Sequence, residues 1–391
     1  MLALLGAEVI HLESSARPDG ARLVGGVPQT EDRFWERGPI FAALNTNKKS
    51  VTIDLGDPRG VDLVRRLVGT CDVVVENYTP RVLDQLGLNY DTLRGDRPDL
   101  IMVRMPGFGL EGPWRDIGAF AFVIEDASGL TWLTGHPDLL PFEPYCVGDP
   151  NAGLHAVFAL MLALEHRERT GEGGLVEAAM VDAALNIAAE QVIEFSAYGA
   201  LLARAGNRGP CAAPQNLYQV APDESGRDDC WVAIAVATDE QWRSLCRALG
   251  EPGWAVDPEF ATVAGRVRAQ DRIDAHLREW CRERPADDVV GRLWDAGVPV
   301  GKVVQPHQQP ELPQLASRRF FEEVLHPVIG VSRYSTLPMR FSRGPERLHQ
   351  RHAPLLGEHN EELLSGLGLS RSDIDALETD GVIGGSLAPA S

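Results

Sequence analysis

The stretch Ser50-Val-Thr-Ile-Asp-Leu55, with Arg59–Val68 and Asp72-Val-Val-Val-Glu76 after it, decides the fold class of this 391-residue chain. The first segment is predicted to be a strand, and the second repeats its apolar residues on one face of a helix. The third is an apolar run between two acids, which is typical of a parallel strand buried on both faces. Strand, helix and strand at this spacing predict a βαβ unit and therefore a parallel sheet.

The pattern continues on both sides of this unit. Residues 8–13 and 100–105 are predicted strands, and 182–198 is a predicted helix. Asp149–Arg169 is the clearest helix, because Asp149 can cap it and the proline that follows fits the first helical position. Its central run, 156–164, is apolar all round and predicts burial on every side.

The domain organisation is predicted from a change in composition along the chain. Residues 1–200 are predicted to form a large Rossmann-like α/β domain, and the turn-rich stretch 203–214 indicates a linker. Strands and amphipathic helices at 212–305 predict a second, smaller α/β domain, and 306–391 form a C-terminal segment.

Composition excludes some classes of protein. The formal net charge is −19, from 37 basic and 56 acidic residues, which disfavours binding to nucleic acid. The six cysteines show no C-x-x-C spacing, so a zinc ribbon or redox pair is not indicated, and we predict no metal site. Reduced thiols and the lack of an apolar run of membrane length favour a cytoplasmic protein that does not bind membranes.

A glycine-rich stretch, Gly107-Phe-Gly-Leu-Glu-Gly112, matches the G-x-G-x-x-G pattern after a predicted strand. A dinucleotide-binding turn should lead into a helix, but Pro113 follows here, and no acid-terminated strand stands about 20 residues further on. We therefore interpret the stretch as a ligand loop of another kind. Serine-hydrolase, zincin and P-loop motifs are absent from the sequence.

Ligands of parallel sheets lie outside the carboxyl ends of the strands, which directs attention to Asn77 and Tyr78. Lys48 and Arg104 are basic residues near that edge, and either could hold a phosphate or be a solvated surface charge. Asp149 also has two interpretations. It could be a helix cap, or an ionised carboxylate at the positive end of the helix dipole that attacks an activated acyl group.

These residues together resemble the class III coenzyme A-transferases, the formyl-CoA transferase and carnitine-CoA transferase group, over nearly the whole chain. The resemblance rests on seven blocks in order: residues 5–10, 44–55, 72–80, 107–113, 148–149, 167–173 and 353–359.

The resemblance implies a Rossmann-like large domain that the segment 306–391 completes, a small domain, and two chains interlocked as a homodimer. It implies that CoA and acyl-CoA are substrates and that no cofactor is permanently bound. It places the nucleophile on Asp149, which would form an aspartyl anhydride and then an aspartyl thioester. The implied ligand contacts are Asn77 and Tyr78 for CoA, Ile53 for the adenine, Lys48 or Arg104 for phosphate, and the region around Phe120 for the thioester.

The chain also departs from the family. About 25 residues that form a strand and helix in the family are not present before Leu4. The glycine run of formyl-CoA transferases is absent near Gly206, and family arginines fall on Ser14 and Gln85. An acyl-CoA racemase would need a histidine where Phe120 stands, so that alternative is disfavoured. A non-catalytic acyl-CoA-binding subunit is the other alternative, and the sequence specifies neither donor nor acceptor.

Overall fold

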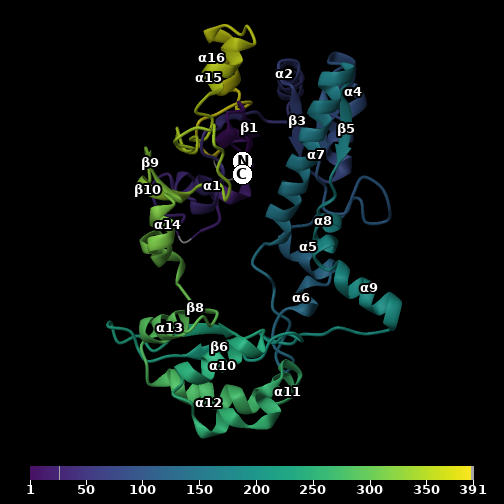
Figure 1. Ribbon diagram of the computed structural model, residues 1–391. Helices are drawn as coiled ribbons and strands as arrows, with labels where there is room; N and C mark the ends of the chain where they lie inside the picture. The colour runs from purple at the N-terminus through teal and green to yellow at the C-terminus, as the bar shows by residue number, and fades with distance from the viewer. Residues whose placement is uncertain (26, 389–391) are drawn as a thin grey trace. The chain divides into compact units, whose positions relative to one another are not determined.

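The computed structural model describes residues 1–25 and 27–388 as a mixed α/β protein (Figure 1). The chain divides into two compact units. The first unit comprises Met1–Ala127, Cys146–Asn186 and the chain from Pro310 onward, and the second comprises Ser128–Tyr145 and Ile187–Gln309. This division differs from the predicted boundaries because 128–145 and 187–200 group with the smaller unit.

The first unit contains two parallel sheets. Strands β1 (Ile10–Glu13) and β2 (Lys49–Thr52) form one of them. Strands β3 (Val73–Glu76), β4 (Ile101–Arg104) and β5 (Gly174–Glu177) form the other, in that order. The predicted parallel pairing is confirmed, but the predicted βαβ unit is wrong.

The reason lies in the pairing of β3. Helix α2 (Pro58–Val68) connects β2 to β3, yet β3 pairs with β4 in a different sheet from β2. As an edge strand β3 is only partly covered, and Val75 is 52% exposed, so its predicted burial on both faces is also wrong. The central strand β4 is buried at all four positions.

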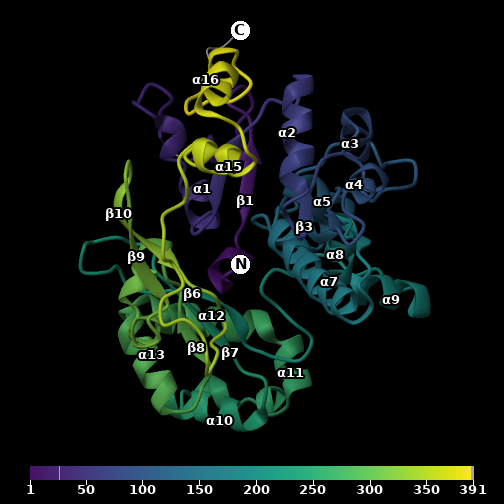
Figure 2. The same cartoon turned by 90° about the horizontal axis from the view of Figure 1, so that it is seen from above.

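The C-terminal segment packs against the β1–β2 sheet, as Figure 2 shows for α15 (Asn360–Gly366) and α16 (Arg371–Thr379). Leu364 and Ile374 from these helices join Val51 of β2 in one buried apolar cluster. Backbone and side-chain hydrogen bonds also reach β2, since Asn360 Oδ1 accepts the Thr52 N–H at 2.9 Å. The resemblance implied this return of the C-terminal segment.

Helix α7 (Gly148–Thr170) lies on β4 and β5 and matches the predicted helix closely. Its buried residues recur every fourth position, at Gly148, Ala152, Ala156 and Leu160. The prediction that it is buried on every side is wrong: Leu154, Phe158, Met161 and Leu162 are 51–66% exposed. The predicted helix 182–198 is divided into α8 (Met180–Ile187) and α9 (Ala189–Tyr198).

The second unit is built on an antiparallel sheet with the order β6 (Gln215–Gln219), β7 (Trp231–Ala235) and β8 (Val300–Lys302). Its own apolar core lies between this sheet and helices α10 (Asp239–Ala248), α12 (Gln270–Arg282) and α13 (Ala286–Asp295). The remaining helices and strands are α1 (Pro39–Leu44), α3 (Pro80–Leu86), α4 (Tyr90–Asp96), α5 (Ala121–Ala127), α6 (Leu130–Leu133), α11 (Val263–Arg268), α14 (Pro313–Ser317), β9 (Phe321–His326) and β10 (Gly330–Ser335).

Within residues 1–25 and 27–388, no helix has both the length and the apolar character needed to cross a membrane.

Candidate active site

Asp149 is the second residue of α7, and its carboxylate faces no internal partner. The helix begins at Gly148, so the prediction that Asp149 is the N-cap is wrong. In the part of the chain that the structure describes, no hydrogen bond or ion pair involves the Asp149 carboxylate. A carboxylate that does not cap its own helix is available for chemistry.

Glu125 explains why Asp149 does not cap α7. This glutamate lies on α5, is 0% exposed, and accepts the Gly148 N–H through Oε1 at 3.0 Å. A free N–H at the start of a helix needs an acceptor, and here a side chain from another helix supplies it. Glu125 was not among the predicted site residues; the available signal was a carboxylate directly after the apolar run Ala121-Phe-Val-Ile124.

Two effects raise the pKa of Asp149 above its ordinary value. Partial burial is the larger cause, because it disfavours the charged carboxylate, and the negative charge of Glu125 is the second. Sequence analysis predicted that the helix N-terminus keeps this group ionised. The pKa moves in the opposite direction, because desolvation and the like charge of Glu125 both raise it.

The glycine-rich stretch packs beside α5. A Cβ on Gly107 would lie 2.6 Å from the Cβ of Ala119, so only glycine fits there. Gly109 has φ +93°, in the left-handed region that favours glycine. No helix begins directly after the stretch, since the next one, α5, starts at Ala121, and this is unlike a dinucleotide turn. Next to it, Phe120 is 75% exposed and stacks on Phe122 with ring centroids 6.3 Å apart.

Asn77 and Tyr78 directly follow β3, and Tyr78 is 45% exposed. The turn is fixed by Glu76, whose Oε2 accepts the Tyr78 N–H at 2.8 Å. Arg104 lies opposite on β4 and donates to Glu76 Oε1 at 2.5 Å and to the Pro80 carbonyl at 3.1 Å. Arg104 is 6% exposed, so its guanidinium stabilises the turn that carries Asn77 and Tyr78.

Ile53 and Lys48, two other predicted ligand contacts, are buried and partly buried. Ile53 is 1% exposed and packs in the core beneath β2, so the predicted adenine contact has almost no accessible surface there. Lys48 Nζ donates to Asn45 Oδ1 at 2.9 Å, and burial lowers its pKa. In residues 1–25 and 27–388, no hydrogen bond or ion pair links either residue to Asp149.

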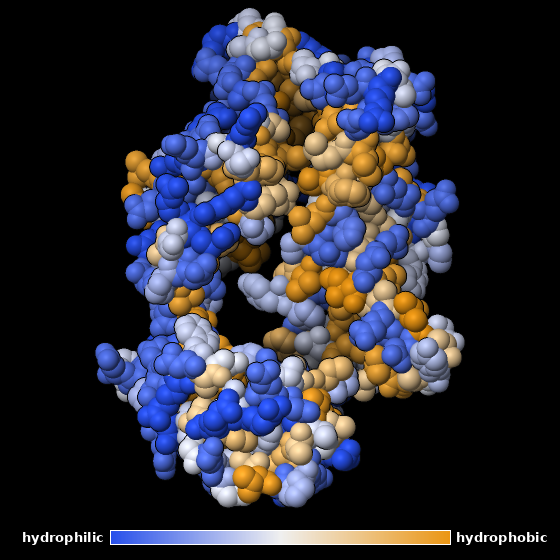
Figure 3. Space-filling model, viewed as in Figure 1, coloured by the Kyte–Doolittle hydropathy of each residue, from blue (hydrophilic) through white to orange (hydrophobic). Residues whose placement is uncertain are grey.

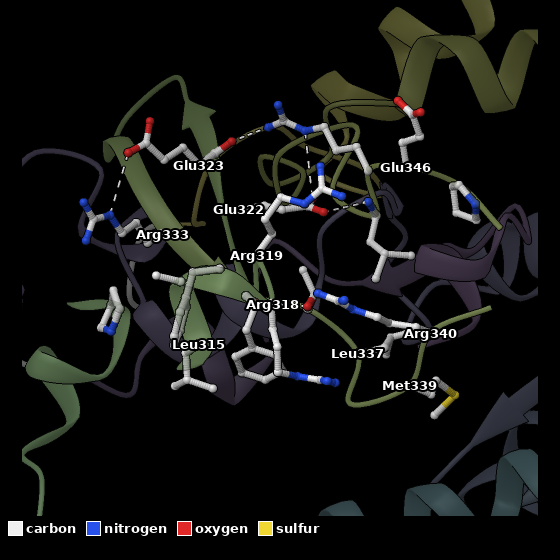
Figure 4. A pocket seen from close by; sticks show the side chains of 18 of the residues that line it. Leu315, Arg318, Arg319, Glu322, Glu323, Arg333, Leu337, Met339, Arg340 and Glu346 are labelled. Atoms are coloured by element: carbon white, nitrogen blue, oxygen red, sulfur yellow. Dashed lines mark hydrogen bonds and ion pairs between the residues drawn. The ribbon is translucent and has the colours of Figure 1, made fainter. Parts of the chain in front are cut away.

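A separate cavity of about 680 Å³ opens on the C-terminal segment of the first unit (Figure 4). Its lining includes five arginines and four glutamates, so the charges nearly cancel. Arg333 pairs with Glu311 at 2.6 Å, and Arg347 lies 3.9 Å from Glu322. None of the predicted site residues lines this cavity.

Among the described residues, no three or more His, Cys, Asp or Glu side chains are placed to hold a metal ion together. None of the six cysteines forms a disulfide within the described residues.

Comparison with known proteins defines the class. The profile of CoA-transferase family III matches residues 1–360. Succinyl-CoA–D-citramalate CoA-transferase of Chloroflexus aurantiacus is 33% identical over 98% of this chain and 93% of its own. Succinate–glutarate CoA-transferase of Agrobacterium fabrum is 32% identical over 94% of this chain and 90% of its own. A crystal structure of a CAIB/BAIF family protein from Brucella suis superimposes with a TM-score of 0.81 at 31% identity, covering 94% of this chain and 93% of its own.

The chain therefore belongs to CoA-transferase family III. It is a CoA-transferase, an enzyme that moves coenzyme A from an acyl-CoA to a carboxylic acid.

Proposed function

We propose that Asp149 is the nucleophile of this transferase. The observation that carries the proposal is that its carboxylate, at an exposed position in the first turn of α7, has no hydrogen-bond partner among the described residues, in a chain of this family. Partial desolvation leaves a carboxylate more reactive toward a thioester, because less water must be removed from it during attack.

The transfer proceeds in balanced steps. An Asp149 oxygen attacks the donor thioester carbonyl, and the C–S bond breaks to give a mixed anhydride and CoA thiolate. The thiolate then attacks the aspartyl carbonyl, releases the donor carboxylate and leaves an aspartyl thioester. The acceptor carboxylate attacks that thioester, and the C–S bond breaks to give a new anhydride and CoA thiolate. The thiolate then attacks the acyl carbonyl of the anhydride, which yields the new acyl-CoA and frees the Asp149 carboxylate.

The start of α7 offers few groups to stabilise the oxyanions. Gly148 donates its N–H to Glu125, Pro150 has none, and Asn151 donates to the Val147 carbonyl at 3.3 Å. This leaves the Asp149 N–H, for which the described residues show no acceptor. One backbone donor therefore remains at the start of α7 for the oxyanion.

Trapping the intermediate tests the proposal. The enzyme is incubated with an acyl-CoA and hydroxylamine, and the peptide containing Asp149 is analysed by mass spectrometry. A hydroxamate on Asp149 is expected in the wild type and must be absent in Asp149→Asn. Asp182→Asn, which changes an aspartate in the first turn of α8, is the matched control and should keep the adduct. A folded wild type without an adduct from any donor favours an acyl-CoA-binding subunit instead.

The donor and acceptor are proposed from the relatives. The two curated relatives described above act, by their names, on succinyl-CoA with D-citramalate and on succinate with glutarate. We therefore infer a dicarboxylic acyl-CoA as donor and a dicarboxylic acid as acceptor. A panel of succinyl-, glutaryl-, formyl- and propionyl-CoA ranks the donors; a higher kcat/KM with formyl-CoA than with succinyl-CoA would contradict this inference.

CoA is proposed to bind at Asn77 and Tyr78, where a polar and an aromatic side chain are exposed beside the turn held by Arg104. Tyr78→Ala should raise KM for acyl-CoA more than it lowers kcat. Phe120 supplies an exposed apolar surface for the thioester arm and has no group that takes a proton, so α-proton exchange is not expected. Deuterium incorporated at C2 of a 2-methylacyl-CoA would contradict this.

A homodimer is proposed from α7, whose exposed apolar side chains need a cover (Figure 3). Phe158 and Met161 are 66% and 54% exposed on this helix. A Phe158→Glu variant should lower the mass measured by light scattering from dimer to monomer, whereas Glu165→Gln near the end of the helix should not. We place the enzyme in the cytoplasm, a reducing compartment that suits six cysteines outside disulfides.

A further inference from the structure

We propose that Glu125 is a positioning residue of the transfer reaction: it takes over the capping of α7 so that the adjacent Asp149 carboxylate stays free to react. The inference rests on the proposed role of Asp149 and extends it to a residue on another helix.

The geometry supports this role in three ways. Glu125 is 0% exposed, and its neighbour on α5, Ile124, is also fully buried, so the carboxyl group is held within the fold. Its Oε1 accepts the N–H of Gly148 at 3.0 Å, the residue directly before Asp149. No side chain of α7 caps the helix, although Asp149 is chemically suited to do so.

Burying a charged carboxylate costs more free energy than burying a neutral amide of the same size. An amide at position 125 could accept the same N–H without a charge. The carboxylate therefore adds something that capping alone does not need, namely a negative charge beside Asp149. That charge opposes ionisation of Asp149 and keeps the attacking oxygens more basic.

Other charged groups lie on the elements around the start of α7. Packed against this helix are α5, β4, β5 and α8, which carry Asp126, Arg104, Glu177 and Asp182 besides Glu125. Arg104 is paired with Glu76, and Glu177 accepts the Leu110 N–H at 2.7 Å. Among these groups, Glu125 is the one whose charge raises the pKa of Asp149.

Three variants separate capping from charge. Glu125→Gln keeps an acceptor and removes the charge, and Glu125→Ala removes both. Asp126→Asn is the matched control, because it removes a charge from the adjacent, exposed position of the same helix. Glu125→Ala should lower kcat by about 10- to 100-fold, since small displacements of a reacting group cost that much. KM for acyl-CoA should change far less, because the groups proposed to bind CoA lie elsewhere.

Two readouts do not depend on activity. Hydrogen exchange of the peptide spanning residues 146–152 should be faster in Glu125→Ala and unchanged in Glu125→Gln, because the glutamine still accepts the Gly148 N–H. Carbodiimide labels protonated carboxyl groups, so labelling of Asp149 against pH reports its titration midpoint. That midpoint should fall in Glu125→Gln and stay constant in Asp126→Asn.

The outcomes separate the two proposals. If Asp149 forms no adduct with any donor, the proposed nucleophile is wrong, while exchange and labelling still decide whether Glu125 caps α7 and acts on Asp149. Wild-type exchange together with a wild-type kcat in Glu125→Ala overturns the capping role. A labelling midpoint in Glu125→Gln equal to the wild type overturns the role of the charge. If Glu125→Ala does not fold, Glu125→Gln tests the charge through its labelling midpoint and the cap through its exchange, because exchange faster than in the wild type would contradict a cap that the glutamine keeps.

Discussion

Removing the guanidinium of Arg22 should strongly destabilise the first unit. Arg22 is 1% exposed and sits between two buried carboxylates. It binds Glu13 through two hydrogen bonds of 2.8 and 2.9 Å and Glu36 through one of 2.8 Å. It also donates to the Pro354 carbonyl at 3.1 Å and lies 3.7 Å from the centre of the Phe41 ring.

The magnitude follows from what the substitution leaves behind. Arg22→Met roughly preserves the length of the apolar stem but leaves Glu13 and Glu36 buried without their cation. Breaking a buried ion pair by removing one partner costs about 3–5 kcal/mol. For a unit of this size, 1 kcal/mol lowers the unfolding midpoint by about 2–4 °C, so we expect a decrease of about 6–20 °C.

Urea unfolding followed by tryptophan fluorescence measures the loss. Arg17→Met is the control, because Arg17 is exposed and has no ion pair in the described residues. A triple variant, Arg22→Met with Glu13→Gln and Glu36→Gln, should regain part of the stability because no charge is left unpaired. A loss below about 1 kcal/mol in Arg22→Met would show that the two carboxylates are hydrated or protonated without cost, and would refute the reasoning.

Three further predictions concern other positions. Gly107→Ala places a Cβ 2.6 Å from the side chain of a neighbouring alanine, so it should destabilise by about 1–3 kcal/mol in thermal unfolding, whereas Gly118→Ala, with open space around it, should not. Tyr218→Phe removes a 2.6 Å hydrogen bond to the buried Asp274 and should cost about 1–3 kcal/mol of second-unit stability in urea; a neutral effect would count against it. Burial lowers the pKa of His326 from 6.5 to about 4, so the unfolded chain takes up the proton first, and stability should fall as pH drops from 6.5 to about 4, by up to about 1.4 kcal/mol per pH unit. The slope of unfolding free energy against pH should be smaller in His326→Gln.

Much of the local structure was predictable because it depends on neighbours in the sequence. The apolar runs predicted β3 and β4, and the long apolar stretch with a charged end predicted α7 to within a residue or two. The seven blocks also identified the family that the profile and the relatives show. The helix and strand signals can be read from the sequence because side chains on one face recur every two residues in a strand and every 3.6 residues in a helix.

Several features of the candidate site depended on residues far apart in the chain. Glu125 caps α7 from 23 residues away, and Arg104 is occupied by Glu76 across 28 residues. Local patterns suggested instead that Asp149 caps its own helix and that Arg104 is available to a phosphate. The pairing partner of β3 was equally hidden, because its sequence fits any parallel neighbour.

By itself, the sequence determined the fold class, the family and the position of α7, since periodic patterns and ordered motifs are written along the chain. Only the tertiary structure decided which carboxylate caps α7, which direction the pKa of Asp149 takes and which side of α7 stays exposed. The physical reason is that hydrogen bonding, desolvation and packing act through space, between side chains that the fold alone brings together.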